Sequence, residues 1–173
     1  MASNSKTRVH TAFQKLPQID ISDLRSTDPA KRLAVAKALG AAARDVGFLY
    51  ITGHGIDPQL IDNLKARTRE FFDQPMAQKM RYYIGQSVNH SGYVPEGEEQ
   101  PGNATSIDHK EAYDINFDYL EANGRKPMLG PTQWPDDEAF KRDVKAYYQA
   151  AFEVSGHLFR GFALALGLPE DTL

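Results

Sequence analysis

The amino-acid sequence predicts a mixed α/β fold that is rich in helix, with three main helices and a few short strands. Three observations favour this class. Apolar residues recur at three- and four-residue steps over three long segments, which is the period of an amphipathic helix. Short runs of β-branched and aromatic residues, which favour strands, lie between these segments. Glycine and proline separate the two kinds of segment and mark their boundaries.

A short edge strand and a helix are the first elements expected. Residues 16–21 alternate apolar and polar side chains beside a proline, as an edge strand can. Asp28 and Pro29 supply a capping oxygen and a proline at the first helical position. Gly47 ends the helix, because glycine adopts the left-handed cap without steric cost. The side chains expected to face the core are Leu33, Ala36, Leu39, Ala43 and Val46.

A buried strand and a second helix are expected next. Residues 48–52 form a continuous aromatic and β-branched run, which indicates a buried strand. Asp57 and Pro58 repeat the helix-start chemistry, and Pro75 marks the end of the helix or a restart. The buried stripe expected on this helix is Leu60, Ile61, Leu64, Thr68, Phe71 and Phe72.

The second half of the chain is predicted to contain a long loop, a strand and a long helix. Residues 85–106 are rich in Gly, Pro, Asn, Ser and Glu and lack periodicity, so they are expected to form a loop of functional importance. A strand is expected over 111–117, where apolar and polar side chains alternate from Tyr113 onward, and a helix is expected over 136–166. Residues 1–14 are polar and predict a flexible tail, which leaves 15–173 as the folded region.

Composition narrows the class of protein. The 20 basic and 23 acidic residues give a formal net charge of −3, so no broad cationic field is expected for nucleic acid or a membrane surface. Cysteine is absent, which removes disulfides and thiolate chemistry and fits a reducing compartment. No apolar run approaches the roughly 20 residues that span a bilayer. We therefore expect a cytoplasmic protein that binds neither nucleic acid nor membrane.

Histidine and carboxylate spacing offers one possible metal site. His109 and Glu111 match an H-x-[DE] pair, and His157 supplies a distant histidine, as in a two-histidine, one-carboxylate iron site. The pattern is short and arises often by chance. A solvated His109 and a half-buried His157 on the long helix are favoured instead, and His54 is interpreted as a turn residue bonded to the backbone. No metal ligand and no catalytic residue is assigned within the chain.

The loop around residues 89–99 is the other candidate site. It places a phenol, an imidazole and several carboxylates on one stretch of irregular backbone, as a substrate-recognition loop does. A solvated acidic loop has the same composition. The residues alone leave both interpretations open.

Several motifs, taken in order, resemble a known family. Residues 16–22, then 47–56, then 71–75 with Lys79, are similar to the N-terminal region of the isopenicillin N synthase-like oxygenases, which include iron(II)- and 2-oxoglutarate-dependent dioxygenases. The resemblance covers about residues 16–173. Further similar segments lie at 91–93, 110–114 and 165–169.

The resemblance implies a larger protein. In this family a double-stranded β-helix, or jelly roll, follows the N-terminal region and supplies the iron ligands and the 2-oxoglutarate site; it is absent from this sequence. The complete protein would thus use Fe(II) and 2-oxoglutarate to oxidise a small molecule, with the jelly roll as partner of this region. The chain alone is expected to bind neither cofactor and to be inactive, contributing scaffold and one wall of the substrate pocket.

The resemblance also suggests three substrate-binding residues. Tyr93 corresponds to a tyrosine that often faces the substrate pocket in relatives. Glu99 lies in a stretch where related bacterial members place an acid against a cationic substrate group. Asn89 is added because it lies near both in sequence. The alternative function is a stand-alone, non-catalytic helical module that binds a protein partner.

Overall fold

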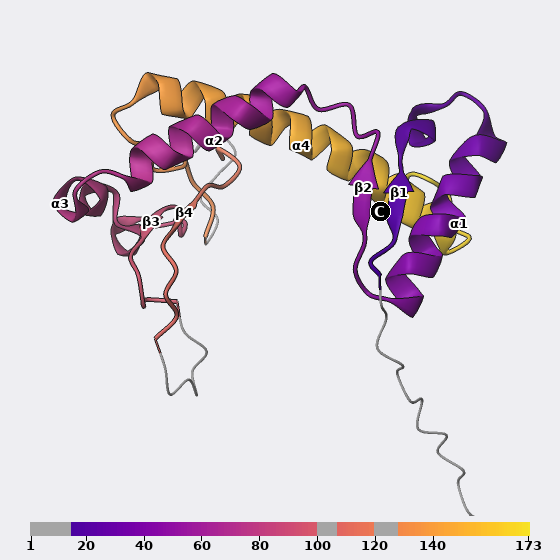
Figure 1. Ribbon diagram of the computed structural model, residues 1–173, viewed down its shortest axis with the longest axis horizontal. Coiled ribbons are helices and arrows are strands. Elements are labelled where there is room, and N and C mark those ends of the chain that lie inside the picture. The colour runs from indigo at the N-terminus through magenta and orange to yellow at the C-terminus, as the bar shows by residue number, and fades with distance from the viewer. Residues whose placement is uncertain (1–14, 100–106, 120–127) are drawn as a thin grey trace, which may run out of the picture. The chain divides into compact units, whose positions relative to one another are not determined.

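The computed structural model describes residues 15–99, 107–119 and 128–173 and divides into two compact units. The described part of unit 1 comprises residues 15–56 and 149–173, and unit 2 lies within residues 57–148. The predicted tail at 1–14 lies outside the described residues. Figure 1 shows the elements in chain order.

Unit 1 is built on a parallel pair of strands joined by a helix (Figure 1). Strand β1 (Gln18–Asp20) pairs with β2 (Tyr50–Thr52), with Ile19 opposite Ile51. Helix α1 (Pro29–Asp45) supplies the crossover that parallel strands require. A 3₁₀ helix, η1 (Ser22–Arg25), lies between β1 and α1. The buried core residues of this unit are Ile21, Leu24, Leu39 and Val154.

The predicted start of α1 is confirmed, but two of the five residues expected to face the core, Leu33 and Ala43, are exposed. The Asp28 carboxylate accepts a hydrogen bond of 2.9 Å from the amide of Ala30, as an N-cap should. Ala36 and Leu39 are buried as predicted, but Ala42 is buried and Ala43 is exposed. The steps of three residues carry the buried stripe to Ala42, so the expectation for Ala43 is wrong.

The predicted burial of the strand at 48–52 is also wrong in part. Leu49 and Ile51 pack against the core of unit 1, whereas Phe48 and Tyr50 are 69% and 63% exposed. Successive side chains of a strand point to opposite faces. The described residues cover only one face of β2, so the continuous apolar run does not become a continuously buried strand.

Unit 2 contains a second capped helix and the first part of the long one. Helix α2 (Pro58–Phe72) begins as predicted, and Asp57 accepts a hydrogen bond of 2.9 Å from the Gln59 amide. After Pro75 the chain restarts as a short helix, α3 (Met76–Lys79), followed by the 3₁₀ helices η2 (Met80–Tyr82) and η3 (Ile84–Gln86). Helix α4 (Glu138–Ala165) begins in this unit and ends in unit 1. None of the helices in the described ranges is long and apolar enough to cross a membrane.

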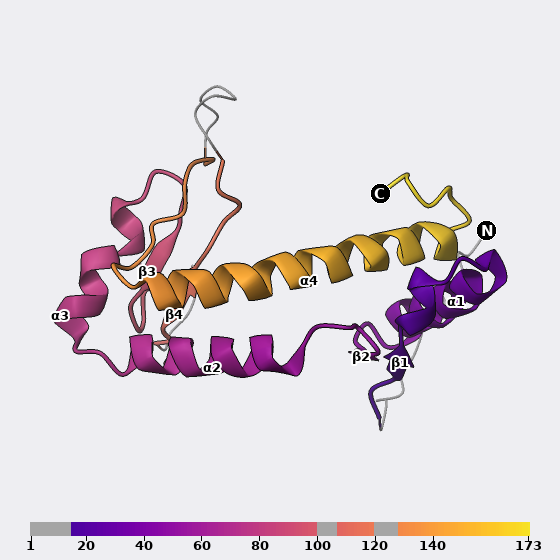
Figure 2. The ribbon, with the colours of Figure 1, turned by 90° about the horizontal axis from the view of Figure 1, so that it is seen from above.

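A two-stranded antiparallel hairpin completes unit 2. Strand β3 (Gly92–Val94) pairs with β4 (Ala112–Asp114), with Tyr93 opposite Tyr113. Strand β3 interrupts the stretch that was expected to be irregular over 85–106, of which 100–106 lies outside the described residues. A strand of three residues is too short to display an alternating pattern, which explains the error. Figure 2 shows the hairpin beside α3 and α2 alongside the beginning of α4.

Gly92 offers a test of the hairpin's packing. It has a φ of +125°, and a Cβ placed there would overlap the carbonyl oxygen of Tyr82 and lie 2.8 Å from the Gln133 side-chain nitrogen. We expect Gly92→Ala to lower the free energy of unfolding by about 2–3 kcal/mol in urea denaturation. Gly156→Ala is the control: apart from the local backbone of α4 and the two neighbouring residues, no atom of the described residues lies within 4 Å of its Cβ position, so a gain of roughly 0.5–1 kcal/mol is expected. Equal effects in the two variants would contradict this packing.

Candidate functional site

The β3–β4 hairpin has two faces with different roles. Tyr93 and Tyr113 form a cross-strand pair and both pack in the aromatic core of unit 2. Val94 and Asp114 are the next residues along their strands, and both line a cavity. Because adjacent side chains of a strand point to opposite faces, one hairpin separates the core from the cavity.

The core behind the hairpin is aromatic and centred on Phe71. Its ring centroid lies 5.0 Å from that of Tyr113, 5.4 Å from Phe140 and 6.1 Å from Tyr93. The rings of Tyr113 and Tyr93 meet that of Phe71 edge to face, an arrangement that adds to the stabilisation from burial alone. Phe71 is 2% exposed and Tyr93 is fully buried. This core fixes one side of the hairpin.

A buried ion-pair cluster lies beside this core. We call it the Lys79 cluster, after its members Lys79, Glu111 and Tyr93. Oxygen Oε2 of Glu111 accepts a hydrogen bond of 2.7 Å from the Lys79 ammonium and one of 2.6 Å from the Tyr93 hydroxyl. The ammonium donates a further bond of 3.0 Å to the carbonyl of Phe72. Lys79 is 6% exposed, so these partners must compensate for the hydration that its ammonium group loses on burial.

The cluster changes the acidity of its members. Burial opposes ionisation of Glu111, but the hydrogen bonds from Lys79 and Tyr93, with the lysine charge, outweigh it and hold the pKa of Glu111 below its ordinary value of 4.5. Burial, the hydrogen bond to Glu111 and its negative charge raise the pKa of Tyr93. Glu111 is thus ionised and Tyr93 is a hydrogen-bond donor at neutral pH.

This lowered pKa predicts a pH dependence of stability. The contribution of Glu111 is fully present above pH 4.5 and is lost as the pH falls through the depressed folded-state pKa, because the unfolded chain then binds the proton more readily. We expect the free energy of unfolding to fall more steeply with acidification in the wild-type chain than in Glu111→Gln. Urea denaturation at pH 6 and at about pH 3.5 measures the two slopes. Identical slopes would contradict the assignment.

The cavity on the other face has a volume of about 360 Å³ and is rich in carboxylates. The Glu98 carboxylate accepts a hydrogen bond of 2.6 Å from the Tyr83 hydroxyl. Glu99 forms an ion pair with Lys110. Burial and the charge of Glu99 raise the pKa of Asp114 above its ordinary value. The lining residues are Ile84, Gly85, Ser87, His90, Val94, Glu98, Glu99 and Asp114.

Of the three predicted substrate-binding residues, the structure brings Glu99 to the cavity. Tyr93 lies on the core face of the hairpin and bonds to Glu111. Asn89 is 2% exposed; its amide nitrogen donates to the Gly130 carbonyl at 2.9 Å and its oxygen accepts from Ser91 at 3.0 Å. Tyr93 and Asn89 therefore support the hairpin from within, and their contact with a substrate stays a prediction.

Asp114 is a cavity residue that was not singled out from the sequence, whereas His90 is the imidazole of the candidate loop at 89–99. Asp114 follows Tyr113 in the strand, so alternation alone assigns it to the face opposite the core. His90 has a φ of +51°, which is uncommon for a residue with a side chain. Its carbonyl accepts a hydrogen bond of 3.2 Å from Asn116, which helps to hold this backbone. The alternation from Tyr113 onward is therefore a sequence signal that could have identified Asp114.

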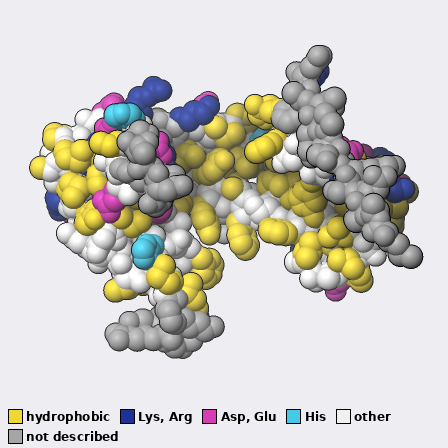
Figure 3. Space-filling view, turned by 90° about the horizontal axis from the view of Figure 1, so that it is seen from below, with side chains coloured by type: hydrophobic (Ala, Val, Ile, Leu, Met, Phe, Trp, Pro, Cys, Tyr) yellow, Lys and Arg dark blue, Asp and Glu magenta, His cyan; other side chains and the backbone are white. Residues whose placement is uncertain are grey.

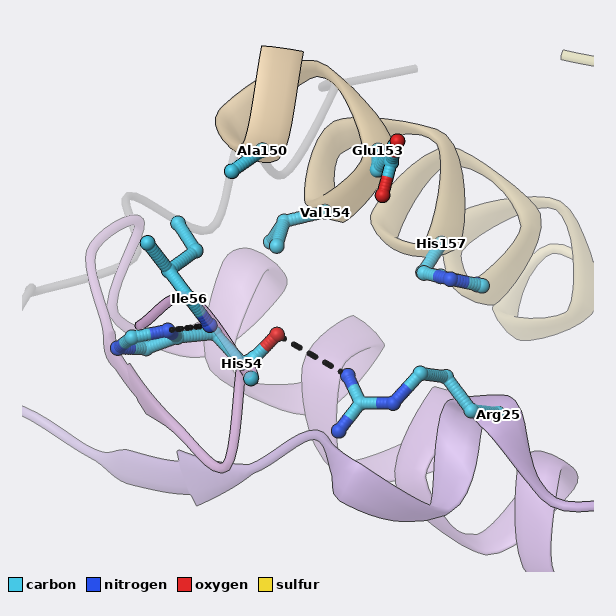
Figure 4. A pocket seen from close by; sticks show the side chains of 8 residues that line it. Arg25, His54, Ile56, Ala150, Glu153, Val154 and His157 are labelled. Carbon is cyan, nitrogen blue, oxygen red and sulfur yellow. Dashed lines mark hydrogen bonds between the residues drawn. The ribbon is translucent and has the colours of Figure 1, made fainter. Parts of the chain in front are cut away.

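A smaller cavity of about 190 Å³ lies in unit 1 and explains His54 (Figure 4). Arg25 donates hydrogen bonds to the carbonyls of Gly53 at 2.8 Å and His54 at 3.1 Å. The His54 Nδ1 atom accepts one of 3.0 Å from the amide of Ile56. His54 is thus confirmed as a turn residue bonded to the backbone. His157, half-buried on α4, lines the same cavity.

The histidine and carboxylate spacing that suggested iron does not form a site. His109 Nδ1 lies 2.5 Å from a Glu96 oxygen on the exposed end of the hairpin, and Glu111 belongs to the Lys79 cluster. His157 lines the cavity of unit 1. Within the described ranges, no three His, Cys, Asp or Glu side chains form a group that could hold a metal ion.

The sequence and structure are similar to known oxygenases. Residues 16–137 match the family described as non-haem dioxygenase in morphine synthesis N-terminal. Homoarginine-6-hydroxylase 2-ODD-C23.1 of Arabidopsis thaliana is 34% identical over 93% of this chain and 52% of its own length. Isopenicillin N synthase of Penicillium rubens is 33% identical over 99% of this chain and 51% of its own.

A solved structure extends the comparison to the fold. A putative 2OG-Fe(II) oxygenase family protein from Caulobacter crescentus superposes with a TM-score of 0.75 and 25% identity, over 90% of this chain and 50% of that one. The chain thus spans about half the length of the relatives it matches. The match to the family covers most of the sequence, so the chain belongs to the non-haem dioxygenase N-terminal family, and the predicted resemblance to the N-terminal region of isopenicillin N synthase-like oxygenases is confirmed.

Proposed function

We propose that the chain is the N-terminal part of a non-haem iron(II), 2-oxoglutarate-type oxygenase that oxidises a small molecule, and that it contributes scaffold and one wall of the substrate pocket. The observation that carries this proposal is the 360 Å³ cavity on the hairpin of a chain that spans half of its oxygenase relatives. The cytoplasmic location that the composition predicts belongs to the same proposal.

Iron and 2-oxoglutarate would be held by the remainder of the protein, which we propose to be a jelly roll. The residues described in this chain offer no group of metal ligands, so they do not fit the iron. When bound in the complete protein, iron and 2-oxoglutarate supply the oxidising chemistry. The task left to this region is to bind and orient the substrate and to exclude water from it.

The charge of the cavity favours a substrate with a cationic group. Glu98, Glu99 and Asp114 all line it, and grouped carboxylates in a concave site attract a cation. Two relatives from Arabidopsis thaliana and one from rice are homoarginine-6-hydroxylases, and homoarginine is a basic amino acid. We propose that the substrate is a basic small molecule and that Glu99 takes part in binding its positive group.

An exposed apolar stripe on α4 supports the larger assembly. Phe152, Phe159 and Leu166 are 61%, 56% and 69% exposed within this chain. They lie seven residues apart, about two helical turns, and so share one face of the helix. Figure 3 shows exposed hydrophobic side chains on the surface of this chain. Contiguous exposed apolar surface marks an interaction site, and we propose that the missing half of the protein covers this stripe.

A stand-alone module that binds a protein partner would use the same stripe. The relatives named above are enzymes about twice the length of this chain, so the comparisons favour an enzyme domain over a free module. A partner contributed by the same polypeptide accounts for the stripe without a second protein. We therefore keep the oxygenase proposal.

Succinate formation by the complete protein tests this proposal. With Fe(II), 2-oxoglutarate, dioxygen and homoarginine, we expect succinate to appear in proportion to the oxygen consumed. Glu99→Gln should raise the KM for homoarginine about fivefold, since an exposed ion pair contributes about 1 kcal/mol. Glu96→Gln is the control, because Glu96 pairs with His109 and does not line the cavity. The absence of succinate would contradict an oxygenase that acts on this basic substrate, and an unchanged KM would contradict the role of Glu99.

A further inference from the structure

The Lys79 cluster lies on the core face of the same hairpin whose opposite face forms the cavity. We propose that Lys79 is a positioning residue: through Glu111 and Tyr93 it fixes the cavity wall against which the basic substrate is oxidised. This inference rests on the proposed function and assigns part of it to a residue that does not line the cavity.

The contacts converge on a single atom. Oε2 of Glu111 accepts one hydrogen bond from the hydroxyl of Tyr93, in β3, and another from the ammonium of Lys79, in α3. The ammonium also binds the Phe72 carbonyl at the end of α2 and lies 5.3 Å from the centroid of the Tyr93 ring. Lys79 thus connects α3 and the end of α2 to Tyr93 in β3 and to Glu111, which directly precedes β4.

The short strands explain how this reaches the cavity. Each strand has three residues, so few ladder bonds resist sliding or tilting, and side-chain contacts must hold the register. Tyr93 directly precedes Val94, and Glu111 directly precedes β4, whose last residue is Asp114. A displacement of the cluster therefore moves the two strand residues that line the cavity.

The other end of the hairpin is anchored separately. Asn89 bonds to Ser91 and to the carbonyls of Gly130 and Pro131, and Asn116 bonds to the carbonyl of Asn89 at 2.6 Å. With that end fixed, loss of the Lys79 cluster would let the hairpin pivot rather than detach. The cavity wall would change orientation while the unit stays folded.

The chemistry of the cluster points to geometry more than to stability. A buried ion pair commonly contributes no more to stability than apolar side chains of the same volume, because both charges lose their hydration. Its directional hydrogen bonds instead hold the connected elements at fixed distances. Lys79 is 6% exposed and Glu111 retains partial exposure, so the pair is largely shielded from water without being isolated.

The coupling ratio of the complete protein tests the inference. The assay contains Fe(II), 2-oxoglutarate, ascorbate and homoarginine, and measures hydroxylated homoarginine formed per succinate. One dioxygen places one oxygen atom in succinate and one in the product, so a well-positioned substrate gives a ratio near one. Where the substrate is misplaced, ascorbate reduces the unused oxidising equivalent and succinate forms without product. Since both quantities come from the same active molecules, the ratio does not depend on the folded fraction.

We compare wild type, Lys79→Met, and the double variant Lys79→Met with Glu111→Gln. The double variant leaves no unpaired charge, so it should regain the stability that Lys79→Met loses. We expect its coupling ratio to remain at least threefold below that of wild type. Arg81→Met is the matched control: it removes a cation from an exposed ion pair with Asp136 in the same unit and should keep the ratio.

Three outcomes would overturn the inference. A folded double variant with the wild-type ratio would show that the cluster does not position the substrate. An equal loss of coupling in Arg81→Met would show that the effect is not specific to the Lys79 cluster. A wild-type protein that forms no succinate with homoarginine would refute the basic-substrate proposal and this inference together, whereas the first two outcomes leave that proposal intact.

Discussion

Replacing Phe71 by alanine is expected to lower the free energy of unfolding of unit 2 by about 4 kcal/mol. Phe71 is 2% exposed, and its ring contacts those of Tyr93, Tyr113 and Phe140. Removing the ring takes away these contacts and leaves a cavity in the core. Urea denaturation followed by tryptophan fluorescence measures the effect, because Trp134 packs against the same core and is the single tryptophan of the sequence.

Phe117→Ala is the control for this substitution. Phe117 lies in the same unit but is 67% exposed, so its replacement should change the free energy of unfolding by less than about 0.5 kcal/mol. A loss of less than about 1 kcal/mol in Phe71→Ala would mean that the aromatic cluster does not support the hairpin. The description of the cavity wall would then fail with it.

The double substitution Phe152→Asp and Phe159→Asp is expected to destabilise the complete protein strongly and to leave the stability of this chain nearly unchanged. If the missing half covers the stripe, the complete protein loses the burial of two phenylalanines, about 4 kcal/mol in total. In this chain alone both side chains are exposed, so stability should change by less than about 0.5 kcal/mol. Self-association of the chain should decrease, because less apolar surface is available to a second copy.

Thermal unfolding and light scattering of both forms provide the measurement. Gln149→Asp with Arg160→Asp is the matched control, since both are exposed positions of α4 that carry polar side chains. It should have little effect in either form. Equal stability of the complete protein with and without the two phenylalanines would contradict the covering of this stripe by the missing half.

Local chemistry made the helices predictable. Asp28-Pro29 and Asp57-Pro58 define helix starts through hydrogen bonds that span two residues, and the structure contains both bonds. The apolar period of α4 extends over many turns, so its existence needed no knowledge of its partners. The exposure of Phe48 and Tyr50 could not be predicted from the sequence. An apolar run indicates that its side chains will be buried, but it does not indicate which part of the protein buries them.

The hairpin and its cavity depend on contacts that are distant in sequence. Tyr93 pairs with Tyr113 twenty residues later, and three-residue strands carry too little pattern to reveal that register. Glu99 was suggested by the family resemblance, and it lines the cavity. Lys79 entered only as part of that resemblance, since a lysine is rarely buried and its partner Glu111 lies 32 residues away.

The central claim is that this chain supplies half of an oxygenase and needs the other half for chemistry. The most direct test is dioxygen-dependent formation of succinate from 2-oxoglutarate, measured with Fe(II) for the 173-residue chain and for the complete protein at equal concentration. We predict succinate from the complete protein and none above the protein-free level from the chain alone. Succinate formation coupled to oxygen uptake by the chain, purified without any partner, would contradict this account.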